Sequence, residues 1–243
     1  MLRLEALSCG YGAMTAVQDL TLDVPRGKVT ALLGANGAGK SSTIMCIAGH
    51  VTVISGNIVY NEKEITRASP MARVKAGIAV VPEGRRLFPN LTVKDNLVVG
   101  GYSQTVENSR EMIERVLALF PRLGDRLKQS AGSLSGGEQQ MLSIGRALMS
   151  NPKLLLIDEL SLGLMPQVID QCYEAIAELK TAGLTIMLVE QSTQRALEMA
   201  DHVCVLESGK EVWQDTADKA RDNAKLIDAL LGLQAEGQGQ VES

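Results

Sequence analysis

The sequence GANGAGKS, from Gly34 to Ser41, is the clearest indication of how this chain folds. It matches the pattern G-x-x-x-x-G-K-[ST] in full, and it lies between an apolar run at 28–33 and a run with helical spacing at 41–49. Glycines in such a loop let backbone N–H groups converge on phosphate oxygens, and the following helix turns its positive dipole end toward them. Lys40 adds a charge for the β- and γ-phosphates, and the Ser41 hydroxyl is a ligand for Mg²⁺. The residues expected to contact a nucleotide here are Gly34, Asn36, Gly37, Ala38, Gly39, Lys40, Ser41 and Ser42.

Two acids at the end of an apolar run are the natural partners of this loop. The run LLLIDE, residues 154–159, is typical of a buried strand that ends in Asp158 and Glu159. Ligands bind at the carboxyl ends of strands in open α/β sheets. We therefore expect Asp158 to hold Mg²⁺ through water and Glu159 to act as general base for a hydrolytic water. A solvated strand end is the alternative interpretation, and the phosphate loop makes it the weaker one.

Composition limits the class of protein. The 243 residues suffice for one α/β domain with an inserted subdomain, and a net charge of −4 argues against a general nucleic-acid binder. Four scattered cysteines and two histidines form no metal-binding spacing. No apolar run reaches about 18 residues and no signal peptide is visible, so we expect a cytosolic protein that works at a membrane only through a partner.

The spacing of apolar residues predicts a core interrupted by a helical insert. The core is expected over 1–83 and 152–232, the helical subdomain over 84–151, and a polar, glycine-rich tail over 233–243 is expected to be disordered. Strands are expected at 2–7, 20–24, 28–33, 76–82, 153–159, 184–190 and 202–210, with a hairpin turn near Asn61. Helices are expected at 41–49, 109–123, 135–150, 167–183 and 193–200, and Gly183 is expected to close the fourth of them.

The stretch LSGGEQQ, residues 134–140, decides the functional class. It is a Ser-Gly-Gly turn that leads into a helix, which makes a second cradle for an anion without any lysine. One chain does not need two phosphate cradles for one nucleotide, whereas two chains that face each other head to tail do. We therefore expect this cradle to close over the nucleotide of a partner chain. Its residues acting in trans are Ser135, Gly136, Gly137 and Glu138.

The phosphate loop, LSGGEQ and LLLIDE, in this order and at these spacings, resemble the ATP-binding cassette (ABC) family over residues 1 to about 232. The resemblance implies an α/β fold: a P-loop NTPase (RecA-like) core with an N-terminal antiparallel β subdomain and an inserted helical subdomain. It implies ATP and Mg²⁺ as ligands, with Tyr11 stacking on adenine and Val17 beside it. An ordinary tyrosine at a strand end is the alternative for Tyr11. Ser161 to Leu164 would cross the dimer interface.

Three positions depart from the commonest pattern of the family. Glu83 replaces a glutamine, Leu160 replaces the proline after the catalytic acid, and Gln191 replaces a switch histidine. Glu83 can ligate Mg²⁺ but cannot donate a hydrogen bond to the attacking water. Gln191 is neutral at all pH, so hydrolysis is expected to show no histidine-type titration. With Lys40 and Glu159, we expect Gln191 to be catalytic.

Glu83 and Gln191 together resemble the ATPase subunit of branched-chain amino acid importers. That resemblance implies a second ABC ATPase subunit in a homo- or heterodimer, two membrane permease subunits on which the helical subdomain docks, and a periplasmic solute-binding protein. It implies no nucleic acid, and it places the chain peripherally at the cytoplasmic face of the inner (plasma) membrane. An importer of urea, amides or small carboxylates, a soluble ABC ATPase, and an unrelated P-loop kinase or GTPase are the alternatives.

Overall fold

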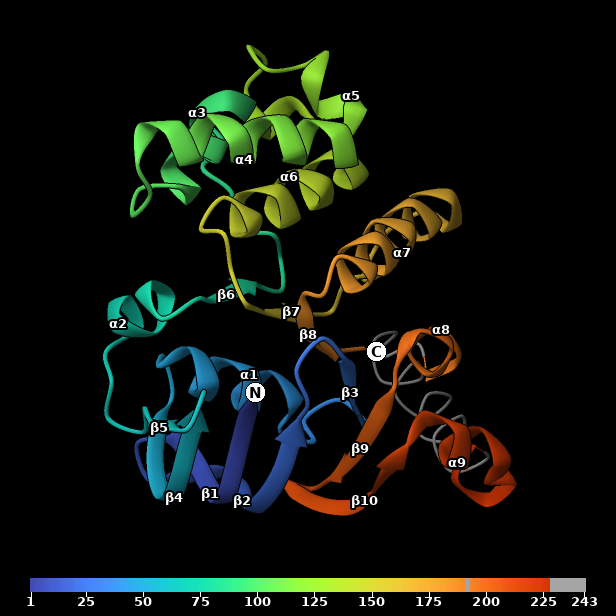
Figure 1. The fold of residues 1–243 in the computed structure, drawn as a ribbon. Coiled ribbons are helices and arrows are strands. Elements are labelled where there is room, and N and C mark those ends of the chain that lie inside the picture. The colour runs from blue at the N-terminus through green and yellow to red at the C-terminus, as the bar shows by residue number, and fades with distance from the viewer. Residues whose placement is uncertain (191–192, 228–243) are drawn as a thin grey trace.

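The computed structural model describes residues 1–190 and 193–227. In this part of the chain the strands form two sheets (Figure 1). The strands are β1 (Leu2–Tyr11), β2 (Met14–Val24), β3 (Val29–Leu33), β4 (Thr52–Tyr60), β5 (Lys63–Glu64), β6 (Ile78–Val81), β7 (Leu154–Asp158), β8 (Thr185–Val189), β9 (His202–Glu207) and β10 (Lys210–Thr216). The helices are α1 (Lys40–Ala48), α2 (Pro70–Lys75), α3 (Val93–Gly100), α4 (Val106–Leu119), α5 (Pro121–Gly124), the 3₁₀ turn η1 (Ala131–Ser133), α6 (Gly136–Leu148), α7 (Pro166–Thr181), α8 (Thr193–Met199) and α9 (Ala217–Asp222).

The smaller sheet is antiparallel, with the strand order β2-β1-β4-β5 among the described residues. β1 and β2 form a hairpin that is longer than the alternating apolar positions predict, because the pairing continues to Tyr11 and Met14. Asn61 and Glu62 connect β4 to β5 at φ 48° and 64°, the two positive values that a two-residue hairpin turn of the I′ type requires. The turn predicted near Asn61 is therefore confirmed.

The larger sheet carries the parallel strands, in the order β10-β9-β3-β8-β7-β6. All of its neighbouring strands are parallel except β9 and β10. Side chains alternate across it: Leu154 and Leu156 of β7 face the cluster around α1, whereas Leu155 and Ile157 face the cluster with α6 and α7. Both faces are covered, which explains why these strands are continuous apolar runs in the sequence.

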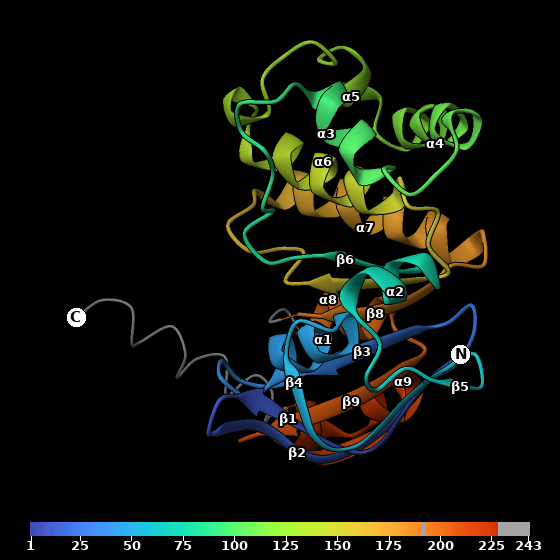
Figure 2. The same cartoon turned by 90° about the vertical axis from the view of Figure 1, so that its left-hand side faces the viewer.

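Helices α3 to α6 form a layer at one end of the molecule, and α7 lies between this layer and strands β6 to β8 (Figures 1 and 2). The predicted helix at 109–123 is α4, and its C-cap is Phe120, just before Pro121. The division of the chain into core and insert stays a prediction. The tail at 233–243 lies outside the described residues.

Several elements were not predicted. β10 pairs with β9 as a hairpin, and the helices α2, α3 and α9 and the 3₁₀ turn η1 lie outside the predicted helices. α7 ends at Thr181, and Gly183 follows its C-cap Ala182 with φ 88°. The expectation that Gly183 closes this helix is confirmed, although the helical residues end two positions earlier than predicted.

In the described part of the chain, no helix combines the length and the apolar character that crossing a membrane requires.

Candidate nucleotide site

The phosphate loop leaves β3 and enters α1, and its lysine is held by the loop itself. Lys40 Nζ donates to the carbonyl oxygens of Gly34 at 2.8 Å and Ala35 at 2.9 Å, and the side chain is buried. Burial lowers the pKa of the Lys40 ammonium, although the charges of Glu159, Asp158 and Glu190 counteract it. These two bonds place the ammonium inside the loop, where it can reach the phosphates that the loop would hold.

Two glycines of the loop are required by close backbone contacts. Gly34 has φ 147° and Gly39 has φ 99°, values that L side chains rarely adopt. A Cβ atom on Gly34 would lie 2.2 Å from the Leu206 carbonyl oxygen, and one on Gly39 would lie 2.7 Å from the Ala16 carbonyl oxygen. The loop therefore packs directly on β9 and β2, which fixes its position over the sheet.

A hydrogen bond joins the loop to the end of β7. Ser41 Oγ donates to Asp158 Oδ1 at 2.9 Å across 117 residues of sequence. β8 separates β3 from β7 in the sheet, so α1 must begin above β8 for this bond to form. Burial raises the pKa of the Asp158 carboxyl above its ordinary value, and the bond from Ser41 opposes that shift. The structure thus brings together two of the three residues expected to hold Mg²⁺, Ser41 and Asp158.

Glu159 follows Asp158 in an unusual backbone conformation. Its φ is 53°, in the left-handed region, and its N–H donates to the Val189 carbonyl oxygen at 3.0 Å. Burial and the neighbouring charge of Glu83 raise the pKa of the Glu159 carboxyl, whereas Lys40 lowers it. A raised pKa near the phosphate loop suits a group that must accept a proton from water.

Glu83 lies at the start of a segment that is tied to α6. Gly84, Arg85 and Arg86 follow it with φ values of 69°, 64° and 44°, so the chain turns sharply after β6. The Arg85 carbonyl oxygen accepts from Ser143 Oγ at 3.0 Å and from an Arg146 guanidinium nitrogen at 3.1 Å. Glu83 is exposed and raises the pKa of both Asp158 and Glu159, yet it does not line the hollow over the phosphate loop.

A hollow of about 440 Å³ covers the loop, and its lining matches most of the predicted nucleotide contacts. Tyr11 stands at its edge with half of its surface exposed, and Glu159 reaches it from β7. Val17 is fully buried beneath Gly39 and does not line the hollow. The predicted residues that line it are Tyr11, Asn36, Gly37, Gly39, Lys40, Ser41, Ser42 and Glu159.

The sequence did not indicate five further residues of this lining. Met14, Thr15 and Ala16 come from the start of β2, and Ser208 and Gly209 come from the turn before β10. The Gly209 N–H donates to the Ala38 carbonyl oxygen at 3.2 Å, which brings that turn to the loop. The SG pair in the sequence indicates a turn, but nothing in the sequence places the turn beside the loop.

Two polar residues follow β8, and the structure describes the first of them. Glu190 is buried, and its carboxylate accepts from the Ser161 N–H at 3.0 Å and from Ser161 Oγ at 2.7 Å. Glu190 therefore holds the loop after β7 in place, in agreement with the structural role that its position at the end of a buried strand suggests. Gln191 lies outside the described residues.

The signature residues lie away from the phosphate loop of their own chain. Ser135 caps α6, and Gly136, Gly137 and Glu138 form its first turn. The hollow over the loop is lined only by residues up to Ser42 and from Glu159 onward, and α6 belongs to the helical layer (Figure 1). Gly137 requires its small size, because an added Cβ atom would lie 2.5 Å from a Val168 methyl group.

The oxygen donors at the loop fit Mg²⁺. A hydroxyl and a carboxylate, 2.9 Å apart between Ser41 and Asp158, are hard ligands of the kind that this ion prefers. Among the described residues no three His, Cys, Asp or Glu side chains gather to enclose a metal. An ion held here would therefore take its other ligands from phosphate oxygens and water, as Mg²⁺ does in nucleotide sites.

Known proteins match the chain over almost its whole length. The family model described as ABC transporter matches residues 17–161. The high-affinity branched-chain amino acid transport ATP-binding protein BraG of Pseudomonas aeruginosa is 47% identical, with 96% of this chain and 100% of that protein covered. The probable branched-chain amino acid transport ATP-binding protein LivF of Archaeoglobus fulgidus is 37% identical, with 96% of this chain and 99% of that protein covered. The solved structure of an ATP-binding subunit of an ABC transporter has a TM-score of 0.83 at 30% identity, with 97% and 99% covered.

The fold and the loop define a P-loop ATPase with an α/β core, which is the predicted fold class. The chain belongs to the ABC transporter family.

Proposed function

We propose that the chain is the ATP-hydrolysing subunit of an importer for branched-chain or related amino acids. The bond between Ser41 and Asp158 carries the ATPase part of this proposal, because it unites the phosphate loop with the acidic end of β7. The solute is supported by the names of BraG and LivF, and by the match over the full length of BraG. Glu83 and Gln191, which resemble that subgroup, point the same way.

The residues at the site supply the parts of a hydrolytic reaction. Lys40 and the loop N–H groups would bind the β- and γ-phosphates, and Tyr11 would stack on the adenine. Ser41 and Asp158, with Glu83 as a further acidic ligand from the segment after β6, would hold Mg²⁺, which neutralises charge on the phosphates. Glu159 would take a proton from the water that attacks the γ-phosphorus, so that the bond to ADP breaks and phosphate leaves. Gln191 would orient that water through its amide.

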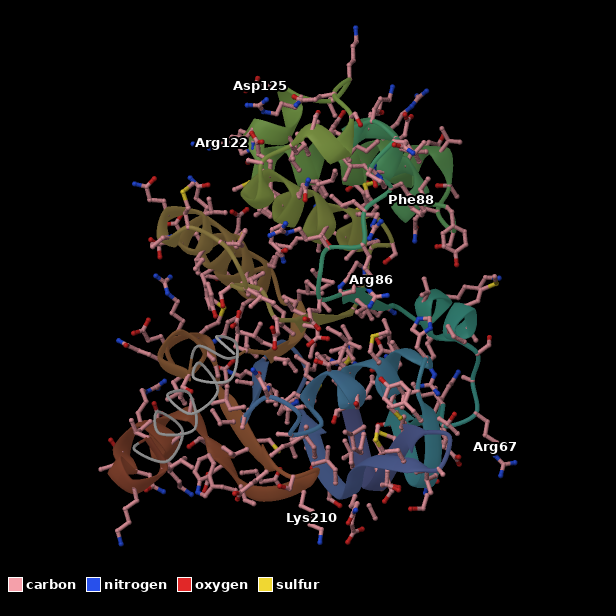
Figure 3. The ribbon with its side chains drawn as sticks, turned by 180° about the vertical axis from the view of Figure 1, so that it is seen from behind. Arg67, Arg86, Phe88, Arg122, Asp125 and Lys210 are labelled. Atoms are coloured by element: carbon pink, nitrogen blue, oxygen red, sulfur yellow. The ribbon has the colours of Figure 1, made fainter. Side chains whose placement is uncertain are left out.

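An exposed apolar surface on the helical layer is the proposed contact with the membrane subunits. Figure 3 shows Phe88 and Arg86 on the segment that leads from β6 into this layer. Phe88 is 47% exposed, and the Arg146 guanidinium lies 5.5 Å from its ring centroid. The surface comprises Phe88, Leu91, Val98, Val99 and Tyr102, all exposed. Two permeases that dock here would hold the ATPase dimer peripherally at the cytoplasmic face of the membrane, with a solute-binding protein on the other side.

Reconstitution with the membrane and solute-binding partners tests the proposed solute. We expect leucine, isoleucine or valine to raise ATP hydrolysis several-fold in lipid vesicles that contain the reconstituted complex, because transport and hydrolysis are coupled. The Lys40→Ala variant should abolish the response and serves as the control for contaminating ATPases. Stimulation by urea, amides or small carboxylates alone would identify the alternative solutes. A rate of ATP hydrolysis that none of these solutes changes would count against a role in transport.

A further inference from the structure

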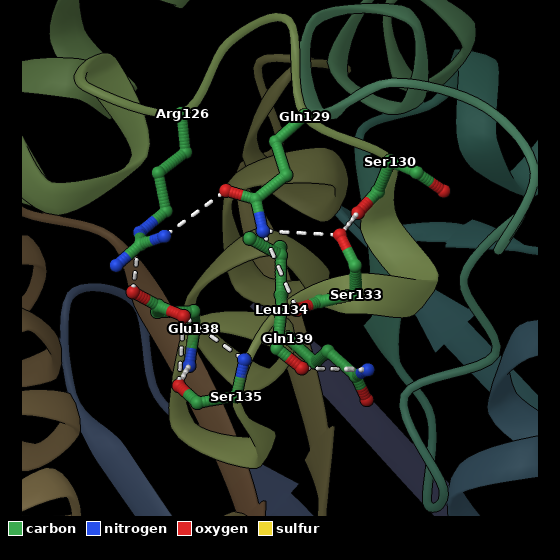
Figure 4. A network of polar contacts seen from close by, with 8 residues as sticks. All are labelled: Arg126, Gln129, Ser130, Ser133, Leu134, Ser135, Glu138 and Gln139. Carbon is green, nitrogen blue, oxygen red and sulfur yellow. Dashed lines mark hydrogen bonds and ion pairs between the residues drawn. The ribbon is translucent and has the colours of Figure 1, made fainter.

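A polar network surrounds the first turn of α6 (Figure 4). Glu138 Oε2 accepts from the Ser135 N–H at 2.9 Å and from Ser135 Oγ at 2.8 Å, while Ser135 Oγ accepts from the Glu138 N–H at 3.3 Å. This is a capping box, in which the side chains of the N-cap and N3 residues satisfy each other's backbone. A glutamine at position 138 would serve the cap equally well, so the cap does not require the negative charge.

Arg126 binds the remaining oxygen of Glu138. Its Nε lies 2.7 Å from Glu138 Oε1, and one of its terminal nitrogens donates to Gln129 Oε1 at 3.0 Å. Gln129 in turn donates to Ser133 Oγ at 3.0 Å, which ties the arginine to the turn before the signature. The Glu138 carboxylate is nearly buried and Arg126 is 44% exposed, so the guanidinium covers the carboxylate from the solvent side.

The charge balance at this cap matters for an incoming phosphate. Burial alone would raise the pKa of Glu138, but the Ser135 hydrogen bonds and the charges of Arg126 and Arg122 outweigh it and hold that pKa below its ordinary value. Glu138 is therefore ionised at neutral pH. The proposed function brings the γ-phosphate of a partner chain to the same helix turn, where an uncompensated carboxylate would repel it.

We propose that Arg126 is the positioning residue of the signature motif: its ion pair with Glu138 neutralises a carboxylate that would otherwise repel the partner's nucleotide, and it keeps Ser135 fixed at the cap. This inference rests on the proposed function, since it needs the signature to act in trans. It adds a residue that lies outside the signature itself and that acts through Glu138.

A double-mutant cycle on ATP-driven dimerisation tests the inference. The Glu159→Gln chain, alone and with a second cassette subunit, is used at saturating Mg-ATP, and the dimer dissociation constant is measured by analytical ultracentrifugation. Arg126→Gln should raise the dimer dissociation constant about tenfold, because the Glu138 carboxylate then faces the partner's phosphate without its ion pair. Water that screens the carboxylate keeps the effect at this size. In the Glu138→Gln background the same substitution should change the dissociation constant less than threefold, because no carboxylate remains to be neutralised.

Two controls separate charge from folding. Arg126→Lys keeps the charge and should restore most of the affinity, and Arg115→Gln removes an exposed arginine outside the network and should leave the affinity unchanged. An equal loss for Arg126→Gln in both backgrounds, or an Arg126→Lys variant as weak as Arg126→Gln, would overturn the inference. A Glu159→Gln chain that forms no ATP-dependent dimer would overturn the proposed function, and this inference with it.

Discussion

At the scale of single residues, the proposed general base Glu159 depends on the residue that follows it. Glu159 has φ 53° and is held by the bond from its N–H to the Val189 carbonyl oxygen. Leu160 is fully buried in the cluster that also contains residues of α6 and α7. The buried leucine therefore anchors the chain immediately after the base, and the absence of proline at position 160 leaves the left-handed conformation of Glu159 accessible.

Replacing Leu160 with alanine tests this anchoring. Alanine removes most of a buried side chain and leaves a cavity where the leucine packs. We expect the free energy of unfolding to fall by about 3 kcal/mol, and ATP hydrolysis to fall about tenfold because the proposed base is held less firmly. Urea unfolding and steady-state hydrolysis measure the two effects. Leu160→Met conserves the volume and should change both little, and a Leu160→Ala chain with full activity would contradict the proposed anchor.

At the scale of elements, Asp201 joins segments that are distant in the sequence. Its carboxylate accepts from the Val29 N–H at 2.8 Å and pairs with Lys180 at 2.9 Å, and its carbonyl oxygen accepts from the Ala217 N–H at 2.9 Å. β3, α7 and α9 thus meet at the start of β9. Burial would raise the pKa of Asp201, but the Val29 hydrogen bond and the lysines Lys180 and Lys28 outweigh it and lower that pKa.

The Asp201→Asn variant should lose this pH-dependent stability. Because the pKa is lower in the folded state, the carboxylate stabilises the fold above its unfolded pKa of about 3.9, and this contribution is lost as the pH falls through the folded pKa. We expect the variant to be about 1 to 2 kcal/mol less stable at pH 7, with the difference shrinking below about pH 4. Urea unfolding across this range measures it. A difference that stays constant with pH would show that the charge plays no part.

Element prediction succeeded where the apolar pattern was unambiguous. β3, β7 and β8 are buried on both faces, so each is a continuous apolar run. α2 and α9 are six residues each and β10 alternates exposed with partly buried positions, so these elements have little apolar periodicity to detect. They form because neighbouring segments pack on them.

At the scale of the whole molecule, the two phosphate cradles lie in different parts of the fold. The loop before α1 sits over the sheet, and Ser135 lies in the helical layer. Leu162 and Met165, in and just after the loop expected to cross the dimer interface, are 49% and 71% exposed. Neither cradle completes the other within one chain, which supports the proposed head-to-tail dimer.

The Glu159→Gln variant should reveal that dimer. Removal of the base stops hydrolysis while the phosphate loop and the signature remain intact, so ATP should stay bound between two cassettes. We expect light scattering to show a dimer with Mg-ATP and a monomer with Mg-ADP, which serves as the control. A variant that stays monomeric in saturating Mg-ATP, alone and with its second cassette subunit, would contradict the proposed head-to-tail dimer.

The local parts of this protein could be predicted from the sequence alone: the phosphate loop, the acids at the end of β7 and the capped start of α6. Each is contiguous, so its residues encode the backbone conformation and the cap directly. Which of these parts meet depends on the tertiary structure, since the order of strands and the packing of helices bring distant residues together. The tertiary structure forms the hydrogen bond between Ser41 and Asp158 and the ion pair between Arg126 and Glu138. It also buries Val17 beneath the phosphate loop.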